Sequence, residues 1–381
     1  MAVKKNFNEK YYRVQLFLGY DENGVRKYKN FYGTGKKDAE LKRDEYKRLL
    51  SSGLSDKNPT LTNSLHEWLF EVIKPSGIKD STFARYYDHY NAIKSTSMAF
   101  MRVADIQAMT IQKILNEMAE KNSYNFVLLI RKFLNRHFTY LVGTNMIMRN
   151  PMQGVQLPQK ARETRTVSDF TYDPYTKAEK QLILLYMEQN HPVYWVVTSL
   201  LFKIGAREGE ILGLRENDLL EDSIRIDSSL AWVKVIKPDG TYHYEYQNDS
   251  TKNKSSEREV FIDNEVHDLL KKARTLKNIS KLKMGAAFTN SDLVFVNPTG
   301  SPIDANSYRK YLKKVQKELG LKIKTVHCIR HTFVTEMYEK GVDEMTVQEI
   351  IGHTKGSNIT RDVYTHLRQE NKKERMLKAI R

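Results

Sequence analysis

Cysteine is almost absent from this chain of 381 residues, which contains Cys328 alone. A single thiol cannot form an intramolecular disulfide, so a disulfide-rich secreted fold is excluded and a reducing compartment is favoured. Long hydrophobic stretches are missing as well, because no run reaches the roughly 18 apolar residues that cross a bilayer. The first residues are polar and do not resemble the core of a secretion signal. The sequence therefore predicts a soluble, cytoplasmic protein with no membrane partner.

Motifs for metal and nucleotide binding are missing too. The chain has no His-Glu-x-x-His run and no cysteine pair with the spacing of a zinc site. Gly35-Lys36 suggests a phosphate-binding loop, but that motif needs a glycine five residues before Gly35 and a Ser or Thr after Lys36. The chain has Asn30 and Lys37 at those places. We therefore expect no bound metal and no cofactor.

Acidic residues are fewer than basic ones. The chain has 62 Lys and Arg against 46 Asp and Glu, which gives a formal net charge of +16. Such an excess favours a polyanionic partner, of which DNA is the obvious kind, although a basic protein whose charges are only solvated is the alternative. The length allows two or three domains, and a hydrophobic content of 40% is enough for real cores.

Residues 1–55 predict a small antiparallel sheet backed by one helix. Tyr11–Leu18 and Val25–Tyr32 alternate with the period of two that indicates half-exposed strands, and Asp21–Gly24 reads as the turn between them. Lys37–Leu50 is a charged, helix-like stretch. Strands that carry Arg, Lys and Tyr suit insertion into a DNA groove, whereas a plain solvated sheet face is the alternative.

Residues 60–157 predict an all-α domain, which a polar link at 51–59 separates from the first module. Apolar residues recur here at spacings of three and four, as they do on the buried face of a helix. The predicted core positions are Leu65, Trp68, Leu69, Val72, Ile73, Ile111, Ile114, Leu115, Met118, Phe126, Leu129, Ile130, Phe133 and Leu134.

A basic, proline-broken linker, Gln156–Arg165, leads to a last domain at 170–381, which mixes helices with short strands. Its pattern predicts helices at 177–190 and 193–204, strands at 223–236, 242–246, 258–262 and 293–297, and helices again from Ile303 onward. Pro238-Asp239-Gly240 predicts a turn. The expected fold of this domain is mainly α with one small antiparallel sheet.

Several short runs of the last domain carry the residue types that phosphodiester cleavage needs. The runs are Gly205–Glu210, Thr251–Ser256, His327–Thr332, Gly352–His353 and Val363–His366. Cleavage requires a nucleophile, neutralisation of charge on the non-bridging oxygens, and a proton for the leaving oxygen. Each run is weak by itself, since a His-x-x-Arg pair is as compatible with a helix surface as with a catalytic site. Together and in this order, they predict a site for phosphoryl transfer.

Each requirement has a matching side chain. Arginine pairs with two phosphate oxygens at once, so Arg207 and Arg330 suit the charge of the transition state. Lys252 can protonate the departing 5′-hydroxyl. Histidine titrates near neutral pH, so His327 suits the acceptor of the nucleophile's proton.

The remaining two members of the set follow His327 in the chain. His353 suits a hydrogen-bond donor to the phosphate. Tyr364 suits the nucleophile, and its phenol, with an ordinary pKa of about 10, needs such neighbours to attack as a phenolate.

In their combination and order, these runs resemble the tyrosine recombinase (phage integrase) family. Phe202–Leu214 resembles the family's first arginine box, with Arg207 as the catalytic arginine and Glu210 as the acid that supports it. The run that begins at Lys252 resembles the lysine box on a β-hairpin. Asn253 replaces the threonine often found there, so Lys254 remains an alternative for the catalytic lysine.

The boxes with His327 and Arg330, with His353 and with Tyr364 complete the family's set, and this completeness implies an active enzyme. The resemblance implies an arm-type DNA-binding domain at 1–55, a core-binding domain that clamps DNA at 60–157 and a catalytic domain at 170–381. It also implies integration and excision of a mobile element, of a temperate phage or a conjugative transposon, through a 3′-phosphotyrosyl intermediate.

The partners that the resemblance implies are double-stranded DNA at core and arm attachment sites and three further copies of the chain in a homotetramer. An excisionase and a DNA-bending host protein are expected on the same ground. Two other functions use similar residues. A type IB DNA topoisomerase shares the tyrosine chemistry, and a catalytically silent DNA-binding regulator could keep the fold. The module before the helical domain speaks against the first, and the complete residue set against the second.

Overall fold

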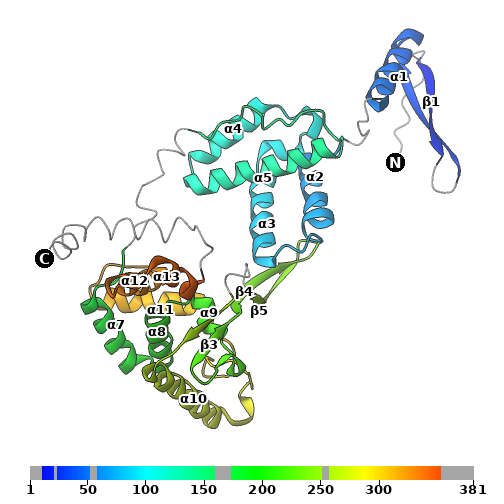
Figure 1. The fold of residues 1–381 in the computed structure, drawn as a ribbon. Helices are drawn as coiled ribbons and strands as arrows, with labels where there is room; N and C mark the ends of the chain where they lie inside the picture. Colours follow the sequence, from blue (N-terminus) through cyan, green and yellow to red (C-terminus); the bar gives the residue numbers. More distant parts are fainter. Residues whose placement is uncertain (1–10, 21–23, 52–57, 159–172, 251–256, 353–381) are drawn as a thin grey trace. The chain divides into compact units, whose positions relative to one another are not determined.

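The structure is a computed structural model that describes residues 11–20, 24–51, 58–158, 173–250 and 257–352. The chain forms two compact units, residues 1–166 and residues 167–381 (Figure 1). The predicted layout of a multidomain, mostly helical protein with small antiparallel sheets is confirmed at this level. The finer division into three domains remains a prediction.

The first module of unit 1 is a two-stranded antiparallel sheet with one helix against it. Strands β1 (Tyr12–Tyr20) and β2 (Arg26–Gly33) pair with an irregularity between Phe17 and Gly19, and helix α1 (Lys36–Ser51) packs on both strands. At Gly33 an added Cβ would lie 2.4 Å from the backbone nitrogen of Ala39, so only glycine lets the strand approach the helix this closely.

The outer face of this sheet is basic and aromatic, because the residues alternate between its two faces. Cross-strand pairs of exposed residues include Arg13 with Tyr32 and Phe17 with Tyr28. The inward positions, among them Val14 and Leu16, are half-buried. The module therefore presents Arg13 and the rings of Phe17, Tyr28 and Tyr32 outward, whereas Lys29 and Phe31 pack on Tyr46 of α1.

The rest of unit 1 is helical. Its elements are α2 (Leu61–Glu67), the π-helix η1 (Trp68–Ile73), α3 (Asp80–Lys94), the short 3₁₀ helices η2 (Ser97–Phe100) and η3 (Val103–Asp105), α4 (Ala108–Ala119) and α5 (Tyr124–Gly143). Most predicted core positions are buried. Leu129 is not, being 43% exposed, and Val127 on α5 is buried in its place. The spacing of apolar residues alone could not decide which of these two neighbours faces the core.

Unit 2 is built around a central helix. Its helices are α7 (Lys177–Asn190), α8 (Pro192–Ile204), α9 (Glu208–Leu212), η5 (Glu216–Asp218), α10 (Asn264–Met284), η7 (Gly285–Ala287), α11 (Ala305–Glu318), α12 (His327–Glu339) and α13 (Glu344–Ile351), and its strands are β3 (Ser223–Ile226), β4 (Ser228–Ile236), β5 (Tyr242–Ser250) and β6 (Arg258–Phe261). Helix α8 is buried almost all round and packs against α7, α10 and α12 (Figure 1). A helix without a polar face belongs in the centre of a domain.

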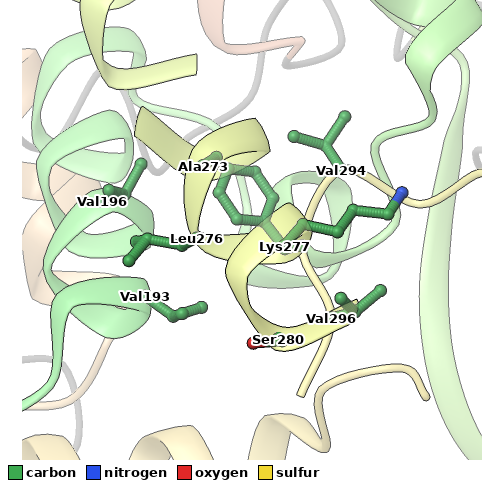
Figure 2. Close-up of a pocket in the computed structure, with 9 residues that line it drawn as sticks. Val193, Val196, Ala273, Leu276, Lys277, Ser280, Val294 and Val296 are labelled. Atoms are coloured by element: carbon green, nitrogen blue, oxygen red, sulfur yellow. The ribbon is translucent and has the colours of Figure 1, made fainter. Parts of the chain in front are cut away.

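The contact between α8 and α10 is tightly filled. Figure 2 shows Val193, Val196, Leu276 and Val294 around a cavity of about 10 Å³, which is no larger than one water. The amine of Lys277 lies at the edge and donates to the carbonyls of residues 291 and 293. This pocket is therefore a packing contact and has no room for a ligand.

Two strand predictions for unit 2 are wrong. The run 223–236 is divided into β3 and β4, which lie in different two-stranded sheets, β3 with β6 and β4 with β5. The run 293–297 forms only isolated bridges, from Leu293 to Arg215 and from Val296 to Pro302. Its residues are buried because the segment passes through the core. An apolar run without alternation does not show whether such a segment is a strand or irregular backbone.

No helix within the described ranges is long and apolar enough to cross a membrane.

Candidate active site

The first predicted arginine lies just after the turn that ends α8. Gly205 adopts a left-handed conformation (φ +61°), and a Cβ there would lie 2.2 Å from Cδ1 of Phe333 on α12. Glycine meets both demands, so the turn passes close against α12. Arg207 follows as the N-cap of α9, and this turn brings it beside the residues of α12.

Glu210 holds Arg207 from both ends. Its carboxylate accepts from the backbone N–H of Arg207 at 2.8 Å and from guanidinium Nη1 of Arg207 at 2.7 Å. The side chain of Glu210 is 1% exposed, whereas that of Arg207 is 39% exposed. The arginine is thus fixed on its inner side and open on its outer side.

Arg330 lies on α12 and is buried. Its Nη1 donates to the carbonyl of Gly205 at 2.9 Å, and its Nη2 donates to the carbonyl of Ile351. Burial first, and then the charge of Arg207, lower the pKa of Arg330, while the charge of Glu210 opposes them. Because a guanidinium starts from a pKa above about 12, Arg330 stays charged at neutral pH.

His327 begins α12, one turn before His331. Burial lowers its pKa, and the nearby charges of Arg330 and Arg207 lower it further. The ring of His331 stands edge-on to it with centroids 4.7 Å apart, and burial lowers the pKa of His331 to about 4. His327 is therefore neutral near pH 7 and able to accept a proton.

Arg207, His327 and Arg330 line one cavity of about 590 Å³. Arg309 and Lys313 of α11 lie on its wall as well, and Arg309 is paired with Glu208. A cavity with this many cations suits an anion, and a phosphate in particular. The fold thus brings three predicted site residues to the wall of one cavity, although they are up to 123 positions apart in the sequence, from 207 to 330.

Arg258 is a fourth arginine of this region, and the sequence patterns did not single it out. It begins β6, its side chain is 6% exposed, and its Nη2 donates to Glu210 at 2.9 Å. The signal for it was the alternation of β6, which puts Arg258 on the same inward face as the buried Val260. An arginine on the inward face of a strand requires a buried acid.

Three arginines hold the end of α13. The carbonyl of Ile350 accepts from Nε of Arg258 at 2.6 Å, that of Ile351 from Arg330, and that of Gly352 from Arg207 at 3.3 Å. The last carbonyls of a helix lack partners within it and carry partial negative charge, so guanidinium groups stabilise them. The helix end next to His353 in the sequence is thereby tied to the arginine cluster.

The other predicted site residues cannot be located. Lys252 and its alternative Lys254, His353 and Tyr364 lie outside the described residues. Of the strands described, β4 and β5 form a hairpin whose turn is at residues 237–241.

Among the described residues, no group of three or more His, Cys, Asp or Glu side chains could hold a metal ion.

Comparisons with known proteins agree with this geometry. The model of the phage integrase family matches residues 176–371. A tyrosine recombinase XerC-like protein of Caldanaerobacter subterraneus subsp. tengcongensis is 32% identical over 384 residues, which is 96% of either chain. The integrase of Staphylococcus phage L54a is 23% identical and covers 87% of this chain and 96% of its own.

Solved structures share the fold. The Tn1549 transposon integrase in complex with transposon right end DNA superposes with a TM-score of 0.63 at 17% identity, over 81% of this chain and 98% of that one. A lambda integrase tetramer bound to a Holliday junction gives a TM-score of 0.58 at 17% identity, over 91% of each chain. The family match, the identity with a full-length relative and the arginine cavity lead to one conclusion: this chain belongs to the phage integrase family, the tyrosine recombinases that cleave and rejoin DNA.

Proposed function

We propose that this protein is a site-specific recombinase that integrates and excises a mobile element by cutting and rejoining DNA through a 3′-phosphotyrosyl intermediate. The observation that carries this proposal is the cavity whose wall Arg207, His327 and Arg330 share. Two guanidinium groups and a neutral imidazole beside one opening match a phosphate that must be held while a proton moves.

In the first step, the hydroxyl oxygen of Tyr364 attacks the scissile phosphorus, and the bond from phosphorus to the 5′ oxygen breaks. His327 takes the phenol proton, which its lowered pKa permits because the ring is neutral. Lys252 gives a proton to the leaving 5′ oxygen, and Lys254 is the alternative donor. The product is a 3′-phosphotyrosyl link and a free 5′-hydroxyl.

The arginines would stabilise the charge that builds on the phosphate. Arg207 and Arg330 bind the non-bridging oxygens, His353 donates a hydrogen bond, and Glu210 keeps Arg207 in place. Because the phosphotyrosyl bond conserves the free energy of the broken phosphodiester, the 5′-hydroxyl of a partner strand can reverse the step and reseal the DNA.

The two parts of unit 1 would each bind DNA, the first module at the arm sites and the helical domain at the core site. The outward Arg13, Tyr32 and Tyr28 of β1 and β2 suit arm-site binding by the module at 1–55. The helical domain at 60–157 would clamp the core site against the catalytic domain at 170–381. Its exposed basic side chains would contact the phosphate backbone, which positions the protein without reading sequence.

Four copies of the chain would act on two duplexes, as in the lambda integrase tetramer that is bound to a Holliday junction. An excisionase and a DNA-bending host protein are the expected further partners. We expect the element to be a temperate phage or a conjugative transposon; the chain is similar to the integrase of a Staphylococcus phage and shares its fold with the Tn1549 transposon integrase.

The test is covalent trapping on nicked attachment-site DNA, whose sequence would be taken from the DNA that flanks the gene. Wild-type protein should give a protein–DNA adduct on a denaturing gel, and Tyr364→Phe should give none while it still binds the DNA. An adduct with the variant would refute the assignment of the nucleophile. Relaxation of a supercoiled plasmid without an attachment site would instead indicate a type IB topoisomerase, and binding without any adduct a silent regulator.

A further inference from the structure

We propose that Arg258 is a positioning residue of this active site, which fixes Glu210 and, through Glu210, sets the guanidinium of Arg207 for the scissile phosphate. The proposal rests on the proposed role of Arg207 in binding that phosphate.

One buried carboxylate joins the two arginines. Oε1 of Glu210 accepts from Nη1 of Arg207 at 2.7 Å and from Nη1 of Arg258 at 3.4 Å. Oε2 accepts from the backbone N–H of Arg207 at 2.8 Å and from Nη2 of Arg258 at 2.9 Å. Because each oxygen is bound from both sides, the carboxylate plane cannot turn without breaking a contact with one of the arginines.

The electrostatics agree with the geometry. Burial alone raises the pKa of Glu210, but the hydrogen bond and the charge of Arg258, followed by the contacts with Arg207, outweigh it and hold the pKa below its usual value. The contribution of Arg258 exceeds that of Arg207. Arg258 and Arg207 together therefore keep Glu210 a carboxylate, which is what Arg207 needs as an anchor.

Arg258 has a second anchor at the end of α13. Its Nε donates to the carbonyl of Ile350 at 2.6 Å. An added Cβ at Gly352 would lie 2.9 Å from Nη1 of Arg258, so the glycine makes room for the guanidinium. One rigid fork thus connects β6, the start of α9 and the end of α13, and a lysine could not make all of these contacts.

Arg258 itself does not line the cavity that the described residues form, whereas Arg207 does. Without Arg258, Glu210 would keep its two contacts with Arg207 but would lose the contacts that tie it to β6 and to the end of α13, and Arg207 would lose its alignment without losing its charge. The loss should therefore appear only when the phosphate carries the charge that Arg207 must meet.

The experiment compares two DNA substrates. One is a nicked attachment-site duplex with an ordinary scissile phosphate, and the other has a methylphosphonate there, in which an uncharged methyl replaces a non-bridging oxygen. Single-turnover cleavage is measured for wild type, Arg207→Ala, Arg258→Met and the control Arg225→Met. Arg225 lies on β3, which pairs with β6, but its side chain is 50% exposed and paired with Asp218.

Arg258→Met should cleave the phosphodiester about tenfold to a hundredfold more slowly, a loss typical of residues that orient a catalytic group. On the methylphosphonate it should lose far less, as should Arg207→Ala, while Arg225→Met should match wild type on both substrates. Equal losses of Arg258→Met on the two substrates, or no loss, would overturn the proposal, because a general structural defect does not depend on the charge of the phosphate.

Two further outcomes are separable. If Arg207→Ala lost the same activity on both substrates, the proposed role of Arg207 would fail. If the loss of Arg207→Ala depended on the charge of the phosphate and the loss of Arg258→Met did not, only the positioning role of Arg258 would fail. Thermal unfolding and DNA binding report whether Arg258→Met folds. If Arg258→Met does not fold, Arg258→Lys is used in its place. The loss of activity in Arg258→Lys should depend on the charge of the phosphate in the same way, and a loss that does not would count against the proposal.

Discussion

Two buried titratable groups, His137 in unit 1 and Glu210 in unit 2, respond to burial in opposite ways. In the helical part of unit 1, His137 is fully buried against Trp68, and its Nε2 is 3.1 Å from the hydroxyl of Ser64. Burial lowers the pKa of His137 to about 3, so this group is neutral. In unit 2, Glu210 is as deeply buried and remains charged, because Arg207 and Arg258 compensate it.

The difference separates packing from chemistry. A buried group that only fills space loses its charge, since an unpaired ion in a protein interior costs several kcal/mol. A buried ion pair is no stronger than good apolar packing, so its presence calls for another reason. In unit 2 the proposed reason is the phosphate, because the same carboxylate that balances the buried arginine anchors the one that opens to the cavity.

The sharpest way to break this comparison is to remove the charge that balances the arginines. Glu210→Ala should lower the free energy of unfolding of unit 2 by about 3–5 kcal/mol, because it leaves Arg258 and Arg330 buried without their anion. Hydrogen exchange in a urea series, read on peptides of α8 and α12, measures the change. A shift below about 1 kcal/mol would show that the cluster is solvated and that the contrast with His137 is wrong.

The sequence predicts the apolar core around His137 better than the arginine contacts of Glu210, for a physical reason. The apolar stripes that include Trp68 on η1 and Phe133 on α5 each repeat within one helical segment, so local spacing reveals them. The contacts of Glu210 join residues 48 and 3 positions away, and only the nearer partner, Arg207, follows from a local run. The alternation of β6 places Arg258 on the inward face, but its role depends on which segments meet there, and periodicity does not encode that.

The same limit explains the errors in strand assignment. Residues 293–297 are apolar because they pass through the core, and their backbone bridges to distant residues instead of a neighbouring strand. The motifs themselves were readable, because Arg207, His327 and Arg330 are recognised by residue type and order. Their shared cavity required the fold, in particular the left-handed Gly205, which lets the turn before α9 pass close against α12.

The pH dependence of stability tests whether His137 is neutral in the folded chain. Above pH 6.5, His137 is neutral in the folded and unfolded chain, so it does not affect stability. Between pH 6.5 and about 3 the unfolded chain binds a proton that the folded chain excludes, so stability falls as the pH falls. From pH 7.5 to 5, the helical part of unit 1 should lose about 2 kcal/mol.

Hydrogen exchange in a urea series at both pH values, read on peptides of α2 and α5, measures this loss. The matched variant is His137→Gln, which does not titrate and should show a correspondingly smaller loss. An equal loss in the variant would assign the pH dependence to other groups.

A second histidine tests the same contrast by activity. The pKa of His327 lies below 6.5, and its neutral form is the proposed proton acceptor. At subsaturating DNA, the cleavage rate should therefore be flat near pH 7 and fall about tenfold per pH unit below the pKa of His327. His327→Gln should lower the plateau and remove this fall. A wild-type profile without an acid limb would exclude His327 as the base.

The smallest effect is expected where an acid of the same type pairs with an arginine in water. Glu216 of η5 accepts from Nε of Arg274 at 2.9 Å, the distance at which Glu210 accepts from Nη2 of Arg258, but the side chains of Glu216 and Arg274 are 35% and 48% exposed. Solvent screens such a pair, so Glu216→Ala should change the free energy of unfolding of unit 2 by at most about 1 kcal/mol in the same exchange assay. Because the residue type, the partner type and the distance match, burial is the variable that separates this pair from Glu210. A loss as large as that of Glu210→Ala would mean that unit 2 depends on ion pairs wherever they lie, and the buried cluster would no longer need a function to explain it.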